Sequence, residues 1–423
     1  MRNDARALLT DLFDSAVEAA HPAHTLNNHL PADRSGRALV IGAGKAAASM
    51  AESLEKAWQG EIGGMVVTRY GHGAECKKIE VVEAAHPVPD NAGFEFSIRV
   101  MELVGHLGAD DTVIFLLSGG GSSLLALPAE GINLEEKQQV TKALLKSGAS
   151  IAEVNCARKH LSAIKGGRLA KACHPAKVIT YAISDVPGDD ATIIASGPTV
   201  GDPTTSADAL AILEQYQIEI PDSVRSWLND PRSETVKPGD PTLDRTEYHL
   251  ISKPQQALEA AATRALSAGI TPIILGDSIE GESREVAKVH AGIARQCYQY
   301  GQPAKPPCVI LSGGETTVTV KGNGRGGRNA EFLLALTDDL KGHPGIYALA
   351  ADTDGIDGTE DNAGCLMTPE SYQRARSTRL DTSAYLANND GYNFFKDLDD
   401  LIITGPTRTN VNDFRAILID KEL

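Results

Sequence analysis

The stretch VIFLLSGGGSSLLALP, from Val113 to Pro128, carries the pattern that decides the fold of this chain. Its first apolar run ends in a turn of glycine and serine, Ser118-Gly119-Gly120-Gly121-Ser122-Ser123, after which apolar residues resume. This pattern is typical of a buried strand whose glycine turn opens a helix. Glycines let the backbone N–H groups of such a turn point toward one place, where serine hydroxyls add donors without charge. A nest of this kind at a helix N-terminus suits a phosphate or a carboxylate.

A flexible glycine turn would be the alternative interpretation if the pattern occurred only once. It occurs again late in the chain, where an apolar run that starts at Cys308 leads into Ser312-Gly313-Gly314-Glu315. The repetition favours a ligand-binding role, so we expect both turns to cradle phosphates.

The length and charge of the chain bound its function. With 423 residues it is too long for one ordinary domain, so two domains are expected. The formal net charge is −16 at pH 7. An acidic surface does not attract phosphate backbones or anionic lipids, which argues against a general nucleic-acid or membrane-surface binder. Any anionic ligand must therefore be held by a local cluster of basic residues.

The six cysteines are scattered and form no C-x-x-C pair. This argues against a zinc site or a disulfide framework and favours a cytoplasmic protein with reduced thiols. Residues 1–22 follow an amphipathic helical pattern with acids among the apolar positions, and they lack the apolar core of a signal peptide. No window approaches the roughly 20 apolar residues that a membrane span needs.

Another glycine turn, Gly42-Ala43-Gly44-Lys45-Ala46-Ala47, follows a predicted strand and opens a predicted helix that runs to residue 57. The spacing G-x-G-x-x-A occurs in dinucleotide-binding turns, but the next predicted strand ends at Arg69, without the acid that binds the ribose of NAD. Arg69 at this position could bind the 2′-phosphate of NADP, so an NADP-dependent enzyme stays a candidate. A lysine at the start of a helix is electrostatically unfavourable, so a bound anion would explain Lys45. An exposed surface lysine is the alternative.

Basic residues are concentrated in NCARKHLSAIKGGRLA, inside a stretch predicted to be helical over residues 151–172. On a helical period Asn155 and Arg158 share one face, and Lys159 follows directly. In an acidic protein this cluster predicts a local positive face for an anionic ligand. A solvated basic helix is the alternative.

Carboxylates follow the strand predicted at residues 177–184, where Asp185, Asp189 and Asp190 lie within six residues of one another. Acids at a strand end beside a glycine turn can hold magnesium or accept a proton from the substrate. As an alternative, Asp190 caps the segment that follows.

A second acidic loop, ADTDGIDGTEDNAG, follows a strand predicted at residues 346–350 and resembles the start of an EF-hand. Ile356 and Ala363 stand where calcium ligands should be, so we reject a calcium loop. Asp352 stays a candidate magnesium ligand.

The polar, proline-bearing stretch 229–245 is the best candidate for a domain linker. Beyond it strands and helices alternate, and Arg325-Gly326-Gly327-Arg328 opens a leucine-rich helix. Two arginines among glycines at a helix start predict a second anion site. Residues 401–419 are predicted to form two strands joined by a polar turn.

Together these features predict two α/β halves, each with a glycine–serine turn, a basic motif and acids at the carboxyl ends of strands, where open parallel sheets bind ligands. Phosphoryl transfer needs cradled phosphates, fixed cations and carboxylates that suit magnesium. A kinase with its site in the cleft between the domains is the function that fits this combination.

The order of the motifs adds a resemblance to a known family. Ten motifs occur in order along the chain, namely GAGKAAASMA, AAHPVPD, LLSGGGSSLL, NCARKHLSAIKGGRLA, ISDVPGDD, ASGPTVGDPTT, SGGETTVTV, GRGGRNAEF, ADTDGIDGTEDNAG and TGPTRTNVND. In these motifs the chain resembles the class II glycerate kinases, also called glycerate 2-kinases. The C-terminal part of these enzymes is the MOFRL domain. The similarity runs from about residue 5 to the C-terminus.

The resemblance implies ATP-dependent phosphorylation of D-glycerate to 2-phosphoglycerate with a divalent metal, taken here as Mg²⁺. It also implies a Rossmann-like domain with a parallel sheet over residues 1–240 and a smaller α/β domain over residues 241–423, which contains the MOFRL region at about residues 305–415. The choice of the 2-hydroxyl rests on the resemblance alone.

The resemblance places the family's active-site lysine at Lys45 and its arginine at Arg325. We expect both to neutralise charge on the transferred phosphoryl group, Arg158 or Lys159 to hold the glycerate carboxylate, and Asp189, or another acid of its cluster, to bind magnesium or orient the 2-hydroxyl. The other candidate residues are those expected to contact substrate or phosphate, namely Gly44, Ser118, Gly119, Gly120, Gly121, Ser122, Ser123, Asn155, Gly313, Gly314 and Glu315, and those expected to reach the metal, namely Asp185, Asp190 and Asp352.

Two other functions stay open at this point. Members of the family have also been labelled hydroxypyruvate reductases, after the tartrate degradation operons in which some occur, so a reductase that uses NADH or NADPH is the competing enzyme class. A reductase of this kind would lack the expected ribose acid. Hydride transfer would also have no use for the second glycine turn or for the cluster of acids. A non-catalytic regulator that binds sugar phosphates is the third interpretation. The oligomeric state is left open, with a homodimer as one candidate assembly.

Overall fold

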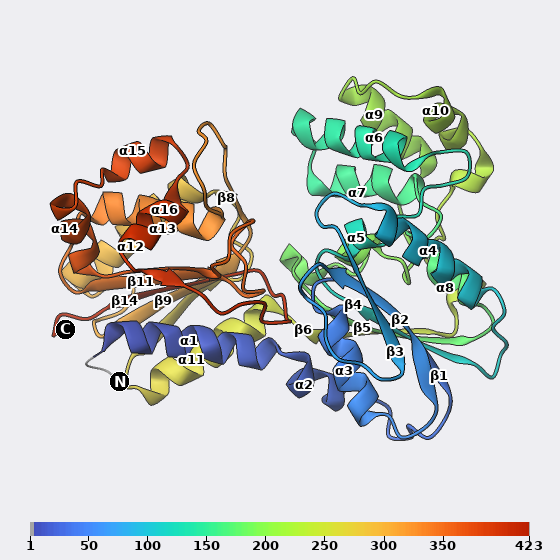
Figure 1. The fold of residues 1–423 in the computed structure, drawn as a ribbon, viewed down its shortest axis with the longest axis horizontal. Helices are drawn as coiled ribbons and strands as arrows, with labels where there is room; N and C mark the ends of the chain where they lie inside the picture. The colour runs from blue at the N-terminus through green and yellow to red at the C-terminus, as the bar shows by residue number, and fades with distance from the viewer. Residues whose placement is uncertain (1–3, 423) are drawn as a thin grey trace. The chain divides into compact units, whose positions relative to one another are not determined.

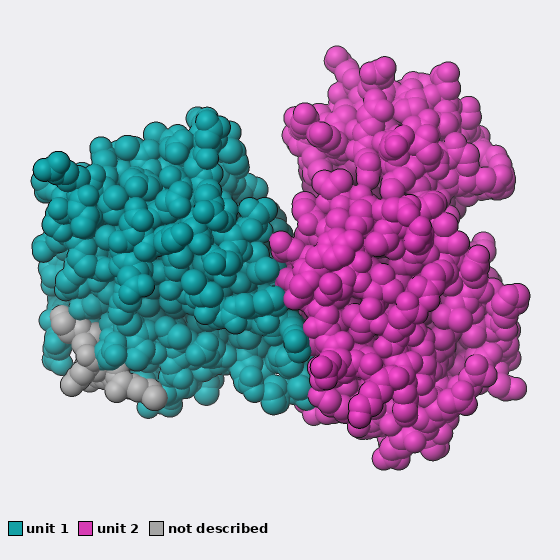
Figure 2. Space-filling view, in the orientation of Figure 1, with its two compact units in different colours: residues 1–24, 252–423 teal, residues 25–251 magenta. Residues whose placement is uncertain are grey.

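The chain folds into two compact units, which Figure 2 distinguishes by colour. The computed structural model describes residues 4–422. Unit 2 comprises residues 25–251, and unit 1 comprises the residues up to 24 together with those from 252 onward. Both units combine a central sheet with helices, as the sequence predicts for an α/β protein.

Unit 2 is built on a six-stranded sheet in the order β3-β2-β1-β4-β5-β6 (Figure 1). The pairs from β3 to β5 run parallel. This is the strand order of dinucleotide-binding folds, which confirms the Rossmann-like prediction. The strands are β1 (Ala38–Ala43), β2 (Ile62–Arg69), β3 (Ile79–Ala84), β4 (Thr112–Leu117), β5 (Lys177–Ile183) and β6 (Thr246–Ser252).

The order of the strands reverses between β1 and β4, the two strands at the centre of the sheet. Open α/β sheets bind ligands at the carboxyl ends of the strands at such a reversal. The chain leaves β1 at Gly44 and leaves β4 at Ser118, so both N-terminal glycine turns predicted from the sequence lie at this point.

Two groups of helices complete unit 2. One group lies along the sheet, and a second group of α6, α7, α9 and α10 packs around an apolar core of its own (Figure 1). The helices of the chain up to residue 228, apart from α1, are α2 (Pro22–Thr25), α3 (Ala47–Ala57), α4 (Asn91–Val104), α5 (Gly121–Leu124), α6 (Leu134–Ser147), α7 (Ile151–His160), α8 (Arg168–Cys173), α9 (Ser206–Gln215) and α10 (Asp222–Leu228).

Residues 151–172 do not form the single helical stretch predicted from the sequence, because the chain breaks between α7 and α8. Gly166 and Gly167 have φ values of +58° and +77°. A Cβ atom would lie 2.6 Å from Thr235 Cγ2 at Gly166 and 2.8 Å from Val236 Cβ at Gly167. Left-handed backbone ends a helix, and the close approach of residues 235–236 leaves no room for a side chain. The break is therefore set by tertiary packing.

The same contact explains why the stretch 229–245 is not a linker. Val236 is 4% exposed, its N–H donates to Gly166 O at 3.0 Å, and its carbonyl accepts from Asp202 N at 2.8 Å. β6, which follows this stretch, completes the sheet of unit 2. The division of the chain after residue 251 therefore differs from the boundary expected at residue 240.

Unit 1 contains a six-stranded mixed sheet in the order β13-β12-β11-β14-β9-β7. β7 and β9 run parallel, and the other pairs are antiparallel. The strands of unit 1 are β7 (Thr271–Gly276), β8 (Gly281–Glu282), β9 (Cys308–Gly314), β10 (Thr316–Thr317), β11 (Ile346–Asp352), β12 (Gly364–Met367), β13 (Leu401–Ile402) and β14 (Asp413–Ile419). β10 is short and pairs with β8 in parallel.

Helices cover both faces of this sheet (Figure 1). α1 (Ala5–Ala20) packs with α11 (Pro254–Ser267) on one face, so the first helix of the chain belongs to unit 1. α12 (Ser283–Tyr300) and α13 (Arg328–Leu340) lie on the other face, and the remaining helices are α14 (Pro369–Ser377), α15 (Thr382–Ala387) and α16 (Gly391–Asp397).

Both strands predicted over residues 401–419 are present, but they do not pair with each other. β13 pairs with β12 at the edge of the sheet, whereas β14 lies between β11 and β9. Every residue of β14 is buried. An apolar strand of this kind reaches a lower free energy in the centre of a sheet than at its edge, because both of its faces leave water.

None of the helices in the described part of the chain is long and apolar enough to cross a membrane.

Candidate active site

The turns after β1 and β4 are bound to each other by one backbone hydrogen bond and by one to the Ser118 hydroxyl. Lys45 N donates to Gly119 O at 2.8 Å, and Ala46 N donates to Ser118 Oγ at 3.0 Å. Gly44 has φ +137°, and a Cβ atom there would lie 2.1 Å from Ser118 Oγ. Gly44 is therefore required by the close approach of the two turns, which form one surface at the reversal point of the sheet.

The turn Ser118–Ser123, hereafter the nest, opens the short helix α5 as the sequence predicts. Gly120 is the residue before α5 and has φ +81°, a left-handed conformation that glycine adopts without strain. A Cβ atom at Gly120 would lie 3.0 Å from His86 Nε2 and 3.4 Å from Lys45 Cγ. The side chains of Lys45 and His86 therefore lie directly against the nest.

The basic helix α7 meets the other end of the nest. Arg158 Nη1 donates to Ser122 Oγ at 3.3 Å and to Asn155 Oδ1 at 3.3 Å. Ser122 and Ser196 share a hydrogen bond of 2.7 Å, and Ser196 Oγ donates to Asn155 Oδ1 at 3.1 Å. Three motifs far apart in the sequence thus meet in one polar network with one positive charge.

Two contributors to this arrangement, His86 and Ser196, were not among the predicted site residues. Ser196 has φ +61° and its neighbour Ala195 has φ +51°, which is uncommon for residues other than glycine. Backbone of this kind persists only where the surrounding structure holds it. The motifs AAHPVPD and ASGPTVGDPTT mark both segments in the sequence, but the motifs alone do not show which side chain turns toward the nest.

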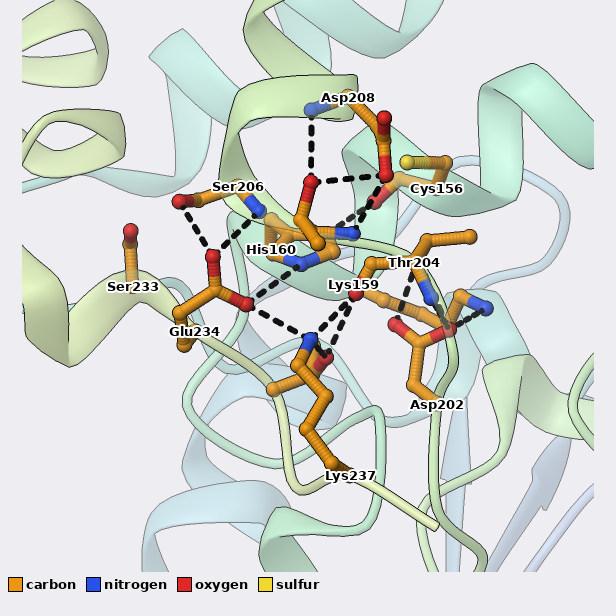
Figure 3. A network of polar contacts seen from close by, with 12 residues as sticks. Cys156, Lys159, His160, Asp202, Thr204, Ser206, Asp208, Ser233, Glu234 and Lys237 are labelled. Carbon is orange, nitrogen blue, oxygen red and sulfur yellow. Dashed lines mark hydrogen bonds and ion pairs between the residues drawn. The ribbon is translucent and has the colours of Figure 1, made fainter.

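Lys159 does not join the nest, although it follows Arg158 directly. Its Nζ forms a buried ion pair with Asp202 Oδ1 at 2.7 Å (Figure 3). Burial raises the pKa of Asp202, but the hydrogen bond and charge of Lys159 outweigh it and hold that pKa below its usual value. The pair anchors α7 to the segment around residue 202, so Lys159 has a structural partner.

Figure 3 shows that this anchor continues into a larger network. Glu234 accepts hydrogen bonds from the N–H and hydroxyl of Ser206 at 2.9 and 2.8 Å and pairs with Lys237 at 2.7 Å. These contacts tie the start of α9 to the stretch 229–245, so that α7 is held in place from behind while Arg158 faces the nest.

The acids after β5 lie in a tight turn. Asp189 has φ +57° within the short 3₁₀ helix of residues 187–189, and Asp190 Oδ1 accepts from Thr192 N at 2.8 Å. The Asp190 side chain thus binds the backbone two residues ahead within the turn, and it does not cap the 3₁₀ helix of residues 194–196, whose N-cap is Ile193. Among residues 4–422, no group of three or more His, Cys, Asp or Glu side chains is arranged to hold a metal ion.

Gly313 and Gly314 do not form a turn before a helix. Both belong to β9 and pair with Phe414 and Asp413 of β14. Gly314 has φ +114°, and a Cβ atom there would lie 2.2 Å from Ile279 N. The segment around Ile279 approaches Gly314 so closely that no side chain fits there. The glycine is therefore explained by packing, which the sequence pattern does not reveal.

Arg325 lies in an exposed loop before α13. Its guanidinium forms an ion pair with Glu360 and packs over the ring of Tyr392, with 4.5 Å between Cζ and the ring centroid. Its backbone N–H donates to Asp390 Oδ1 at 2.8 Å, and its carbonyl accepts from Tyr392 N at 2.9 Å. The Arg325 side chain is 52% exposed.

Arg328 gathers three carboxylates around itself. It binds Asp413 at 2.7 Å, Asp352 at 2.8 Å and Glu315 at 2.9 Å. Two of the predicted ligand-binding acids, Asp352 and Glu315, are thus ion-pair partners of an arginine.

The start of α13 is capped by an acid of the chain itself. Asp357 accepts hydrogen bonds from Asn329 N at 3.0 Å and Ala330 N at 2.8 Å. Complete burial raises the pKa of Asp357 to about 6, against the lowering effect of these two bonds. The anion site predicted at this helix start is therefore taken up by Asp357.

Two protein families match parts of the chain. Residues 8–229 match a domain of unknown function, DUF4147, and residues 308–413 match the MOFRL family. The second match lies within unit 1 and extends from β9 to the start of β14.

Relatives along the full length carry two kinds of name. The chain is 43% identical over 416 residues to the D-glycerate 2-kinase of Thermotoga maritima, with 98% of each chain covered. It is 52% identical over 418 residues to a protein of Agrobacterium vitis named "Putative hydroxypyruvate reductase", with 98% of this chain and 94% of that protein covered. The crystal structure of a glycerate kinase from T. maritima superposes with a TM-score of 0.88 at 43% identity, covering 98% of this chain and 99% of that one.

Proposed function

This chain, with its DUF4147 and MOFRL regions, belongs to the family of the glycerate 2-kinases, and we propose that it transfers the terminal phosphoryl group of ATP to the 2-hydroxyl of D-glycerate. The single observation that carries the proposal is the meeting of two cationic side chains at one nest. Lys45 lies against Gly120, and Arg158 donates to Ser122.

The arrangement suits phosphoryl transfer because that reaction depends on positioning and on fixed positive charge around the moving group. The N–H groups of the nest bind phosphate oxygens, and Lys45 neutralises the charge that develops on the transferred group. Arg158 binds the carboxylate of glycerate, because a guanidinium matches a carboxylate with two parallel hydrogen bonds. Lys159 is left out of this role because Asp202 holds it.

Mg²⁺ is part of the proposal as the companion of the nucleotide. Mg²⁺ is usually bound by one or two carboxylates together with substrate phosphates, so one or two of the acids after β5, Asp185, Asp189 and Asp190, would hold such an ion together with the phosphates of the nucleotide. When bound, it supplies charge neutralisation to the phosphates. Asp189 is the proposed acid that orients the 2-hydroxyl and receives its proton. Asp352 is left out because it pairs with Arg328.

Arg325 is proposed as a phosphate-binding residue. Its motif, GRGGRN, supports this role, and so does a side chain that is half exposed and whose guanidinium is held over the ring of Tyr392.

A reductase acting on hydroxypyruvate is the second candidate, which the name of the A. vitis relative suggests. An NAD-dependent enzyme of this fold needs an acid at the end of the second strand. β2 ends at Arg69, and Tyr70 follows it, so the ribose acid is missing. The kinase names of full-length relatives support phosphoryl transfer instead.

The test is an assay of the purified protein with both reactions in parallel. One sample contains D-glycerate, ATP and Mg²⁺ and is followed by phosphorus NMR, and a second contains hydroxypyruvate with NADH or NADPH and is followed by absorbance. A 2-phosphoglycerate signal with constant absorbance supports the kinase. A 3-phosphoglycerate signal would correct the choice of hydroxyl, and oxidation of the cofactor without a phosphoester would replace the kinase by the reductase.

A further inference from the structure

Two buried lysines lie behind the nest, and neither was among the predicted site residues. Lys137 of α6 is 7% exposed, and its Nζ donates to Leu127 O at 3.4 Å. Lys165, between α7 and α8, is 1% exposed, and its Nζ donates to Leu125 O at 2.9 Å. Leu125 directly follows α5, the helix that the nest opens. Both ammonium groups therefore bind the segment that leaves the nest.

These lysines have no acidic partner. In the described chain from residue 4 to 422, no carboxylate forms an ion pair with Lys137, Lys165 or Arg158. The acids Asp202 and Glu234 in the same region are already paired with Lys159 and Lys237 (Figure 3). Because no carboxylate offsets their burial, the charged forms of Lys137 and Lys165 are disfavoured, and an anion bound nearby would favour them.

The mutual influence of the cations shows that they form one cluster. Burial, and then the charges of Arg158 and Arg168, lower the pKa of Lys137 to about 7. Burial, and then the charges of Lys137 and Arg158, lower the pKa of Lys165 well below its ordinary value. Arg158 reaches Ser122 Oγ at 3.3 Å, and this brings the positive potential of the cluster to the surface of the nest.

The nest has two separate cationic contacts. Lys45 and His86 lie against Gly120, whereas Arg158 approaches the nest at Ser122. A kinase that phosphorylates an acid must bind two anionic groups, the phosphates of the nucleotide and the carboxylate of the acceptor. A planar guanidinium backed by buried lysines fits the carboxylate, which is planar, better than it fits a tetrahedral phosphate that moves during the reaction.

We propose that Lys137 and Lys165 are positioning residues, which fix the segment behind the nest and, together with Arg158, form an anion subsite for the carboxylate of the acceptor substrate. The inference rests on the proposed function, because it names the groups that recognise the acid of D-glycerate. The lysines do not touch the substrate. They act through Arg158 and through the carbonyl groups of Leu125 and Leu127.

The first test uses the wild-type protein and needs no substitution. D-glycerate, without nucleotide, is titrated calorimetrically into the protein in buffers of different ionisation enthalpy at pH 6 to 8, with glycerol as the neutral comparison. A bound carboxylate favours the charged form of Lys137, whose neighbours Arg158, Arg168 and Lys165 all oppose that form. We expect proton uptake on binding, and an affinity for glycerate that falls as the pH rises through about 7. Glycerol should cause no uptake.

Binding of glycerate without proton uptake and without this pH dependence would overturn the inference. Turnover of the same preparation with ATP separates the two claims. An active enzyme whose glycerate binding takes up no proton contradicts the lysine subsite alone, whereas a protein that neither binds nor phosphorylates glycerate contradicts the proposed function.

The second test compares Lys137→Met and Lys165→Met with Lys142→Met, which removes an exposed lysine from the same helix as Lys137. We expect the KM for D-glycerate to rise about tenfold or more in the first two variants, while the KM for ATP changes little. The control should behave as the wild type. A rise in the KM for ATP instead, or an unchanged KM for glycerate, would contradict the assignment to the carboxylate. If circular dichroism shows that the variants do not fold, the wild-type titration decides.

Discussion

Gly120 is the residue on which the geometry of the nest depends most directly. We expect Gly120→Ala to lower turnover by about a hundredfold or more, because the new methyl group would press on His86 and Lys45 and displace the lysine from the phosphate. Steady-state kinetics with D-glycerate and ATP would measure the loss. The matched control is Gly131→Ala, since Gly131 has a similar φ of +79° but no atom within 4 Å of the added Cβ. Equal losses in both variants would mean that backbone strain, not contact, is responsible.

Loss of Lys159 should lower the stability of the fold, whereas loss of Arg158 should lower activity. Lys159→Met leaves the carboxylate of Asp202 buried without its partner, so we expect the free energy of unfolding to fall by about 3 kcal/mol or more. Urea denaturation would measure this change. Lys177→Met removes an exposed partner of Glu247 and should cost about 1 kcal/mol at most. A large rise in the KM for glycerate in a stable Lys159→Met variant would show that Lys159 binds substrate after all.

At the scale of the element, the start of α13 shows how a carboxylate of the chain replaces an expected ligand. The GRGGRN motif has the arginines and glycines of an anion site, but Asp357, distant in sequence, accepts the N–H groups of the helix. The sequence predicts the helix start correctly. It does not predict that Asp357 binds there, because Asp357 comes from another loop.

The burial of Asp357 gives this element a pH signature. Burial raises the pKa of Asp357 in the folded chain to about 6, above the ordinary value of 3.8 that it has in the unfolded chain, so between these values the folded state binds more protons than the unfolded state. The stability contribution of Asp357 is therefore present at low pH and is lost as the pH rises from about 4 to about 6. The unfolding free energy of the wild type, relative to Asp357→Asn, should fall by about 1.4 kcal/mol per pH unit in this window. Parallel stability curves of the two proteins would contradict the assignment.

The parts of the site that follow from local sequence were predicted, and the parts that depend on contacts between distant segments were not. The strands and turns around Gly44 and Ser118 follow from apolar runs interrupted by glycine, which are local signals. The reversal of strand order then brings these turns together, as the fold class predicts. The pairing of Lys159 with Asp202 and the burial of Gly313 in β9 depend on contacts between distant segments, which no local pattern contains. The placement of β14 in the centre of its sheet was missed for the same reason.

At the scale of the whole molecule, the division into units assigns α1 to the C-terminal part of the chain. The ring of Phe13 in α1 is 1% exposed and lies 5.8 Å from that of Phe414 in β14. Phe13→Ala should cost about 3–5 kcal/mol, because it removes a buried ring and leaves a cavity. Hydrogen exchange should become faster in α11 and β14 and stay unchanged in β1 and β4. Faster exchange in β1 and β4 would contradict this assignment of α1.

The central proposal is that phosphoryl transfer takes place at the nest, where the strand order of the parallel sheet reverses, and that Lys45 neutralises charge on the transferred group. The most direct measurement is the turnover number of Lys45→Ala with saturating D-glycerate, ATP and Mg²⁺, beside Lys56→Ala, which removes an exposed lysine from the end of α3, the helix that follows Lys45. We predict that Lys45→Ala loses turnover by about a thousandfold or more and keeps the circular dichroism of the wild type, while Lys56→Ala is unaffected. A folded Lys45→Ala protein with near-normal turnover would contradict the account.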